Sequence, residues 1–152
     1  LRDVYKRQTQ ERASDTLELV SGRTDYTRLK GIKEWNFDLF EAQPERLQPK
    51  FRLGATSFED LFVPYGGEGV DQVGERMLVT LTEVMERADA EPVLAVSHGG
   101  AMWAFYLKIA AQDLDPKVRF GNCAICHYQY EQGHFKLAEV IDPLTGDVYE
   151  SE

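Results

Sequence analysis

Residues 93–107 read VLAVSHGGAMWAFYL, an apolar run that is broken once, by Ser97-His98-Gly99-Gly100. The part before the break, VLAVS, is short and largely apolar, which is typical of a strand buried on both faces. The two glycines then turn the chain into AMWAFYLKIAAQ, which is typical of an apolar helix. The stretch therefore predicts a buried strand and a helix, with a titratable histidine at the junction between them.

The segments on either side of this unit complete an α/β pattern. Upstream, apolar residues at spacings of three and four predict an amphipathic helix; they are Val70, Val73, Met77, Leu81, Val84, Met85 and Ala88. Downstream, NCAICHYQY and HFKLAEVI flank Glu131-Gln132-Gly133 and predict two antiparallel strands joined by a turn. Helix, buried strand, helix and hairpin is the order expected of an α/β sandwich.

The first half of the chain has a less regular pattern. Residues 1–8, LRDVYKRQ, are charged and do not join smoothly to the next segment, so we interpret them as a ragged start. The periodicity of TQERASDTLELV predicts a helix from Thr9. Residues 24–40 predict a short strand followed by an aromatic loop. Residues 42–68 carry three of the six prolines and several glycines, which predicts an irregular or partly helical excursion and a candidate lid.

Composition limits the classes of protein and partner. A chain of 152 residues with 43% hydrophobic content is long enough for one domain with a real core, so we expect a single domain over 1–152. The net charge of −9 argues against nucleic acid or an anionic membrane as the main partner. The net charge does not argue against a small anionic ligand, because such a ligand needs only a local positive pocket. With no long apolar run and no apolar signal core, the expected location is the cytosol. The sequence leaves open whether the chain forms a homodimer.

The Ser97-His98-Gly99-Gly100 turn is the strongest candidate site. Ligands of open parallel sheets bind where strands lead into helix N-termini, and glycines there let the backbone approach an anion. A histidine in this place can donate to a phosphoryl oxygen, act as acid or base, or serve as nucleophile. The alternative is a histidine that only caps the turn. Arg12 and Glu34 are weaker candidates, because each alone is more often structural.

Together these motifs resemble those of the histidine phosphatase superfamily, the phosphoglycerate mutase-like proteins, over roughly residues 9–142. The strongest match is the strand that ends in Ser97-His98-Gly99-Gly100. The other matching segments are Arg12-Ala13 followed by Thr16, the loop from Leu29 to Glu41 with Glu34, Gly67-Glu68-Gly69 before a long helix, and Asn122-Cys123-Ala124. The order and spacing of the segments carry the resemblance.

The resemblance implies a three-layer α/β/α sandwich with a mostly parallel sheet and helices on both faces. It also implies a phosphomonoesterase that acts on a small phosphate monoester through a phosphohistidine, with no metal and no other cofactor. His98 would hydrogen-bond the phosphoryl oxygens together with Gly99, and Arg12 would clamp the same oxygens bidentately. Glu34 would protonate the leaving alkoxide and then activate water.

The family's nucleophile has no counterpart in this sequence. The family places it in an Arg-His-Gly motif at the end of the first strand, whereas the three histidines here, His98, His127 and His134, follow Ser97, Cys126 and Gly133. We therefore expect an N-terminally incomplete copy that lacks the first strand and the nucleophile, with 1–8 outside the family. Such a chain should not turn over a phosphate ester substrate.

Three other functions are weighed against this one. A degenerate, non-catalytic domain that binds phosphorylated ligands or a protein is the main alternative. A phosphoglycerate mutase is less favoured, because the excursion at 42–68 is short for one. CAICH, residues 123–127, fits covalent haem attachment, but strand alternation would point Cys123 and Cys126 to opposite faces. The same geometry argues against zinc.

Overall fold

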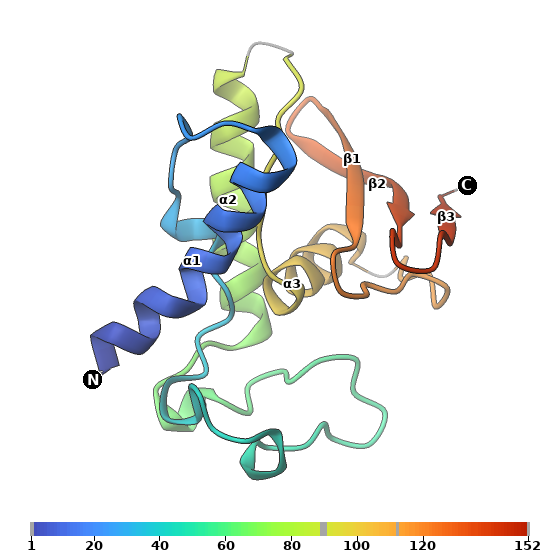
Figure 1. Cartoon of the computed structure of the whole chain (residues 1–152). Helices are drawn as coiled ribbons and strands as arrows, with labels where there is room; N and C mark the ends of the chain where they lie inside the picture. Colours follow the sequence, from blue (N-terminus) through green and yellow to red (C-terminus); the bar gives the residue numbers. More distant parts are fainter. Residues whose placement is uncertain (1, 89–90, 112, 152) are drawn as a thin grey trace.

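The computed structural model describes residues 2–88, 91–111 and 113–151, and its fold is α/β (Figure 1). Its helices are α1 (Arg2–Ser21), α2 (Val70–Arg87) and α3 (Gly99–Ala110), and its strands are β1 (Ile125–Glu131), β2 (His134–Ile141) and β3 (Val148–Glu150). Short 3-10 turns cover Lys30–Ile32, Asp38–Phe40, Glu45–Leu47 and Val63–Tyr65. None of the helices in the described ranges is long and apolar enough to cross a bilayer.

Helices α2 and α3 pack closely and form the centre of the main core. α2 begins at Val70, which confirms the helix predicted from its periodicity. α3 confirms the predicted apolar helix, although it begins at Gly99 and so includes the two glycines. A Cβ on Gly74 would lie 2.8 Å from the Ala104 carbonyl oxygen, so glycine allows the two helices to approach here. The buried members of this core are Trp35, Val73, Met77, Ala101, Ala104 and Phe105.

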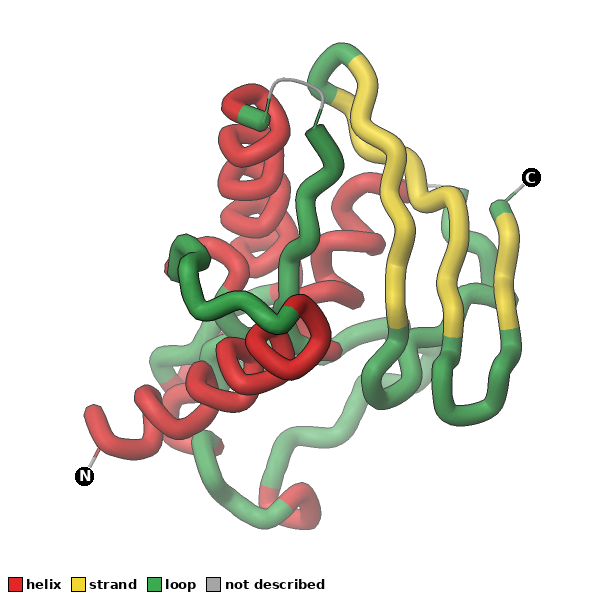
Figure 2. Tube along the Cα trace, turned by 45° about the horizontal axis from the view of Figure 1, so that its top comes forward, coloured by secondary structure: helices red, strands yellow, loops and turns green. Residues whose placement is uncertain are grey.

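The sheet is antiparallel with the strand order β1-β2-β3 (Figure 2). The β1–β2 hairpin confirms the prediction, and its turn places Gln132 and Gly133 at φ of 50° and 83°, as a tight hairpin turn requires. β3 was not predicted, because three residues within a polar tail carry no alternation. A second core lies between the sheet and α3, with Tyr106, Val118, Leu137 and Val140 as its buried members.

Residues 93–97 differ from their prediction as a buried strand. The segment is extended, but none of its backbone groups hydrogen-bonds to another segment within the described residues. A strand exists only beside a hydrogen-bonded neighbour, and an apolar run specifies the extended backbone without supplying that neighbour. The sheet of the described residues is accordingly small and antiparallel, and a parallel three-layer sandwich is not present among them.

Two predictions for the first half were also wrong. α1 starts at Arg2, so 2–8 continue the helix and are not a ragged start. The physical reason is that no glycine or proline occurs before Gly22, where φ of 66° ends the helix. The strand predicted within 24–40 is also not formed. Its first part is irregular backbone, on which Tyr26 donates a side-chain hydrogen bond to Glu18 at 2.8 Å.

The excursion at 42–68 is irregular with short 3-10 turns, as predicted. Phe62 is completely buried and organises the region. Its ring contacts Phe37, Phe40 and Phe58, and Phe58 in turn contacts Trp35 and Phe51. This aromatic cluster attaches the excursion to the loop that carries Glu34. That the excursion acts as a lid stays a prediction.

Candidate functional site

His98 is the residue that precedes the first turn of α3. Its backbone is extended, with φ −134° and ψ 155°, and its carbonyl accepts the first helical hydrogen bond from Met102 at 2.9 Å. The residue is 7% exposed. Burial lowers the pKa of His98; Arg12 and Arg76 also lower it, whereas the Glu34 charge opposes the shift. At neutral pH the imidazole is therefore uncharged and carries one N–H donor.

Glu34 lies against the start of the same helix. Its Oε1 accepts hydrogen bonds from the backbone amides of Trp35, at 2.8 Å, and of Ala101, at 2.9 Å. The first turn of a helix carries unpaired N–H groups and a partial positive charge, so this is a favourable place for a carboxylate. The two amides fix the orientation of the carboxyl group. Neither amide engages the second oxygen, Oε2.

Arg12 approaches that second oxygen from α1. Its Nη2 lies 3.8 Å from Glu34 Oε2, and its side chain is 55% exposed against 21% for Glu34. This distance is too long for a direct hydrogen bond, so the guanidinium keeps donors available for another anion. The structure thus brings together Arg12, Glu34 and His98, from three separate segments. Their catalytic roles stay predictions.

The two glycines of the turn have different surroundings. A Cβ on Gly100 would lie 2.8 Å from Glu34 Oε1, so only glycine lets the carboxylate reach the helix start. A Cβ on Gly99 would meet nothing within 4 Å. Among the described residues the amides of both glycines have no hydrogen-bond acceptor. Gly99, a predicted phosphate-binding residue, therefore presents its backbone to open space.

Two further residues organise the site: Arg76, which sequence reasoning missed, and Ser97, which it placed in the turn without a role. Arg76, on α2, donates to backbone carbonyls of the Glu34 loop, which we define as residues 30–36. Ser97 donates through its hydroxyl to the Ile32 carbonyl at 2.8 Å and so ties the histidine turn to the same loop. Glu68, from the Gly67-Glu68-Gly69 segment, pairs with Arg76, but that segment does not indicate which residue is its partner.

A groove with a volume of about 680 Å³ runs along the extended segment and reaches His98 at one end. Its walls come from α1, the loop after it, the second half of α2 and the segment 93–96. Val93 and Leu94 are 41% and 57% exposed there, which is unusual for the apolar residues of a central segment. The groove therefore exposes both apolar side chains and unpaired backbone.

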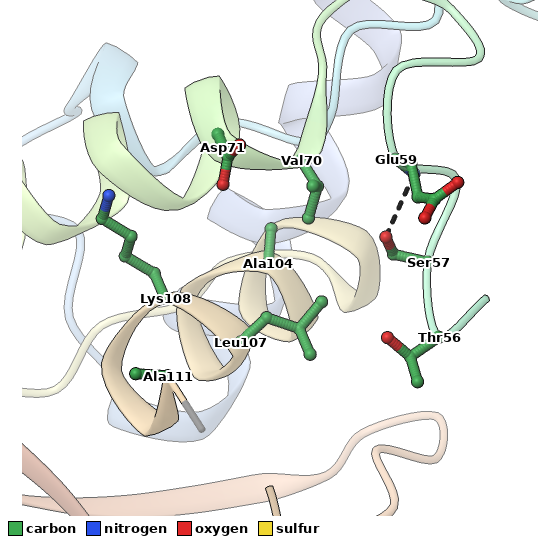
Figure 3. A pocket seen from close by; sticks show the side chains of 9 residues that line it. All are labelled: Thr56, Ser57, Glu59, Val70, Asp71, Ala104, Leu107, Lys108 and Ala111. Atoms are coloured by element: carbon green, nitrogen blue, oxygen red, sulfur yellow. Dashed lines mark hydrogen bonds between the residues drawn. The ribbon is translucent and has the colours of Figure 1, made fainter. Parts of the chain in front are cut away.

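A second cavity, of about 400 Å³, is lined by residues of α2, α3 and the excursion (Figure 3). It lies between the start of α2, the excursion and the second half of α3. Two of its polar side chains are engaged within the chain: Lys108 pairs with Glu75 at 2.8 Å, and Ser57 accepts the Glu59 amide at 3.0 Å. None of Arg12, Glu34 and His98 lines this cavity.

The two cysteines differ in burial. Cys123 is exposed, whereas Cys126 packs against the second core, and burial raises the pKa of its thiol to about 12. Metal ligation requires the thiolate, which this surrounding disfavours. The geometry gives no support to a haem or zinc site on CAICH.

Comparison with known proteins gives the family of the chain. The family model of the histidine phosphatase superfamily (branch 1) matches residues 9–143. The chain is 31% identical over 87 residues to a metal-independent phosphoserine phosphatase of Arabidopsis thaliana, an alignment that covers 57% of this chain and 35% of that protein. The chain thus spans about a third of the length of this relative. No solved structure gives a significant match. Because the family model covers most of its residues, the chain belongs to the histidine phosphatase superfamily, branch 1.

Proposed function

We propose that this chain belongs to a phosphomonoesterase that acts on a small phosphate monoester in the cytosol. The observation that carries the proposal is the convergence of Arg12, Glu34 and His98 at the start of α3, beside two free glycine amides. Cationic, neutral and amide donors around one open space suit a phosphoryl group, because its transfer depends mainly on positioning and charge stabilisation. The similarity to a phosphoserine phosphatase supports this choice of reaction.

Each side chain has a role that its geometry allows. The neutral imidazole of His98 donates its N–H to a phosphoryl oxygen, and the amides of Gly99 and Gly100 add two donors at a helix N-terminus. Arg12 supplies a planar fork that matches two phosphoryl oxygens. Glu34 Oε2, which neither amide engages, supplies the proton for the leaving group. No step in this scheme requires a metal.

The proposed reaction has two steps, and each is balanced. The ester binds as its monoanion, and its phosphate proton passes to the Glu34 carboxylate. In the first step, a histidine nitrogen attacks phosphorus, the bond from phosphorus to the ester oxygen breaks, and Glu34 gives that proton to the leaving alkoxide. In the second, a water oxygen attacks phosphorus, Glu34 takes one proton of the water, and the phosphorus–nitrogen bond breaks. The alcohol leaves, inorganic phosphate leaves with the proton from Glu34, and both side chains return to their starting states.

We further propose that the nucleophilic histidine lies on a strand outside the described residues, which inserts between the segment 93–97 and β1. Two features support this position. The segment 93–97 has no backbone partner in the described part of the chain, and β1 is an edge strand that lies nearest to it in both views (Figures 1 and 2). Unpaired strand edges of this kind bind a further strand. With that strand the sheet would be continuous and gain parallel pairing, giving the three-layer sandwich of the family.

Phosphate release from a panel of small monoesters, phosphoserine included, tests the proposal. The chain 1–152 should release none, and the chain extended by the coding sequence upstream of residue 1 should release phosphate and lose this activity in His98→Ala. Activity of 1–152 that His98→Ala abolishes would refute the external nucleophile. Binding of inorganic phosphate gives a second measurement: Arg12→Lys should weaken it, whereas Arg23→Lys, at an exposed pair with Asp25, should not.

The second candidate is a domain that binds phosphorylated ligands or a protein without chemistry. It is favoured by the donors at His98 and Gly99, which suffice for binding an anion. It predicts phosphate binding together with no release by the extended chain on any ester. A phosphoglycerate mutase stays a lesser candidate, which transfer of the phosphoryl group between two sugar-acid hydroxyls would reveal.

A further inference from the structure

Arg76 uses all of its hydrogen-bonding capacity around the Glu34 loop. Its Nε and Nη2 donate to the two carboxylate oxygens of Glu68 at 2.7 and 2.9 Å. The remaining N–H groups donate to the backbone carbonyls of Gly31, Lys33 and Glu34 at 2.7, 2.9 and 3.0 Å. A guanidinium has five N–H donors, and here each has one acceptor. Such complete engagement, with a side chain only 18% exposed, fixes the guanidinium rigidly.

Glu68 completes the attachment from the other side. Its Oε2 also accepts the Asn36 amide at 2.9 Å, and its backbone oxygen accepts the Trp35 indole N–H at 2.7 Å. Its own amide donates to the Asn36 carbonyl at 2.9 Å. Burial alone would raise the pKa of Glu68, but the hydrogen bonds from Arg76 and Asn36 outweigh it and lower the pKa. The carboxylate therefore stays charged and paired.

These contacts surround Glu34 in the sequence. Arg76 holds the carbonyls of the residues before it and of Glu34 itself, while Glu68 holds the two residues after it. The loop also passes tightly over α2, since a Cβ on Gly31 would lie 1.7 Å from the Thr80 hydroxyl. Backbone attachment on both sides fixes the point from which the Glu34 side chain extends to the Ala101 amide at the start of α3.

We propose that Arg76 and Glu68 are positioning residues that hold the Glu34 carboxyl at the start of α3. The part of this inference that concerns catalysis rests on the proposed function, in which Glu34 is the proton donor. A displacement of about 1 Å in such a group can lower the rate on the order of a hundredfold. Lysine at position 76 would keep the charge but could not serve five acceptors, because an ammonium group has three donors.

Amide proton shifts test the positioning without any activity. The amides of Trp35 and Ala101 both donate to Glu34 Oε1, so their NMR resonances report the position of the carboxylate. Glu34→Gln defines the shifts that follow loss of its charge. Arg76→Lys should move both resonances toward those values, and Glu68→Gln, the milder variant, should move them in the same direction.

Arg52→Lys is the matched control. Arg52 also pairs with two carboxylates, Glu59 and Asp60, at 2.9 Å each, but it is 56% exposed. Its substitution should leave both resonances unchanged. Wild-type shifts in folded Arg76→Lys and Glu68→Gln would overturn the proposal. If Arg76→Lys does not fold but Glu68→Gln does, the amide shifts of Glu68→Gln test the proposal.

Leaving groups separate positioning from a general structural role. In the active extended protein, Glu68→Gln and Arg76→Lys should lower kcat about 10- to 100-fold for alkyl phosphates, whose leaving oxygen needs a proton. For an aryl phosphate with an acidic phenol, kcat should stay near the wild-type value. Equal losses of kcat on alkyl and aryl phosphates would overturn the inference that the two residues act through proton donation by Glu34. If wild type releases no phosphate from either, the proposed function fails, and the amide shifts still test the positioning.

Discussion

Gly100→Ala should displace the carboxylate of Glu34 while leaving the rest of the chain in place. The added Cβ would lie 2.8 Å from Glu34 Oε1, whereas ordinary contacts begin at 3.4 Å, so the oxygen must retreat by about 0.6 Å. A retreat of this size takes the hydrogen bond from Ala101, now 2.9 Å, beyond the usual range of about 2.7–3.2 Å.

The expected loss of stability follows from the two opposing effects. A hydrogen bond to a charged group contributes about 1.5–3 kcal/mol, and most of that would be lost. Alanine is more favourable than glycine within a helix by about 0.5–1 kcal/mol. Gly100→Ala should therefore lower the free energy of unfolding by about 1–2 kcal/mol. Gly99→Ala is the matched control, because its Cβ meets nothing within 4 Å and should not destabilise the chain.

Urea denaturation of four proteins measures the effect: wild type, Gly100→Ala, Glu34→Ala and the double variant. Without the Glu34 side chain the added methyl has nothing to displace, so Gly100→Ala should become neutral or slightly stabilising. The coupling between the two sites should be about 2 kcal/mol. An equal loss of stability from Gly100→Ala in both backgrounds would refute the steric argument.

Three further predictions concern other buried groups. Burial lowers the pKa of His98 below 6.5, so the unfolded chain binds this proton more readily, and stability falls as the pH drops below that value. His98→Gln should therefore shrink the difference in unfolding free energy between pH 7.5 and 5.5. An unchanged difference would contradict this assignment to His98. Phe62→Ala should cost about 3 kcal/mol in urea denaturation, because the residue is completely buried, and a cost below about 1 kcal/mol would show that the excursion repacks. The hydroxyl of Tyr128 is buried without a partner among the described residues, so Tyr128→Phe should raise stability by about 1 kcal/mol in the same assay, and a loss would mean that it has a partner.

Local pattern predicted the elements whose causes are local. α2 follows from apolar spacing along one segment, and the β1–β2 hairpin follows from two alternating runs around Gln132-Gly133. The segment 93–97 shows the limit of such reasoning. Its apolar residues favour an extended backbone, but strand pairing depends on a second segment. The sequence VLAVS does not indicate whether that second segment is present.

The candidate site was predictable only in part, for a similar reason. His98 stands out because a histidine and two glycines interrupt an apolar run, and the resemblance to a family directed attention to Arg12 and Glu34. Arg76 carries no such signal. Its three carbonyl acceptors lie 42 to 45 positions away, and backbone carbonyls have no sequence signature. A polar residue on an amphipathic helix is usually solvated, so only the fold reveals this one.

The position of His98 depends on α3 more than on the segment that precedes it. Phe105 packs in the core between α2 and α3, and the next residue, Tyr106, packs in the core beneath the sheet, so one helix is fixed by both cores. The first turn of that helix is tied to Glu34 through Ala101, and the histidine turn to Ile32 through Ser97. His98 and Glu34 therefore keep their relative positions although residues 93–97 have no hydrogen-bonded strand partner among the described residues. A strand added beside that segment would meet the proposed phosphate site, whose donors are already in place.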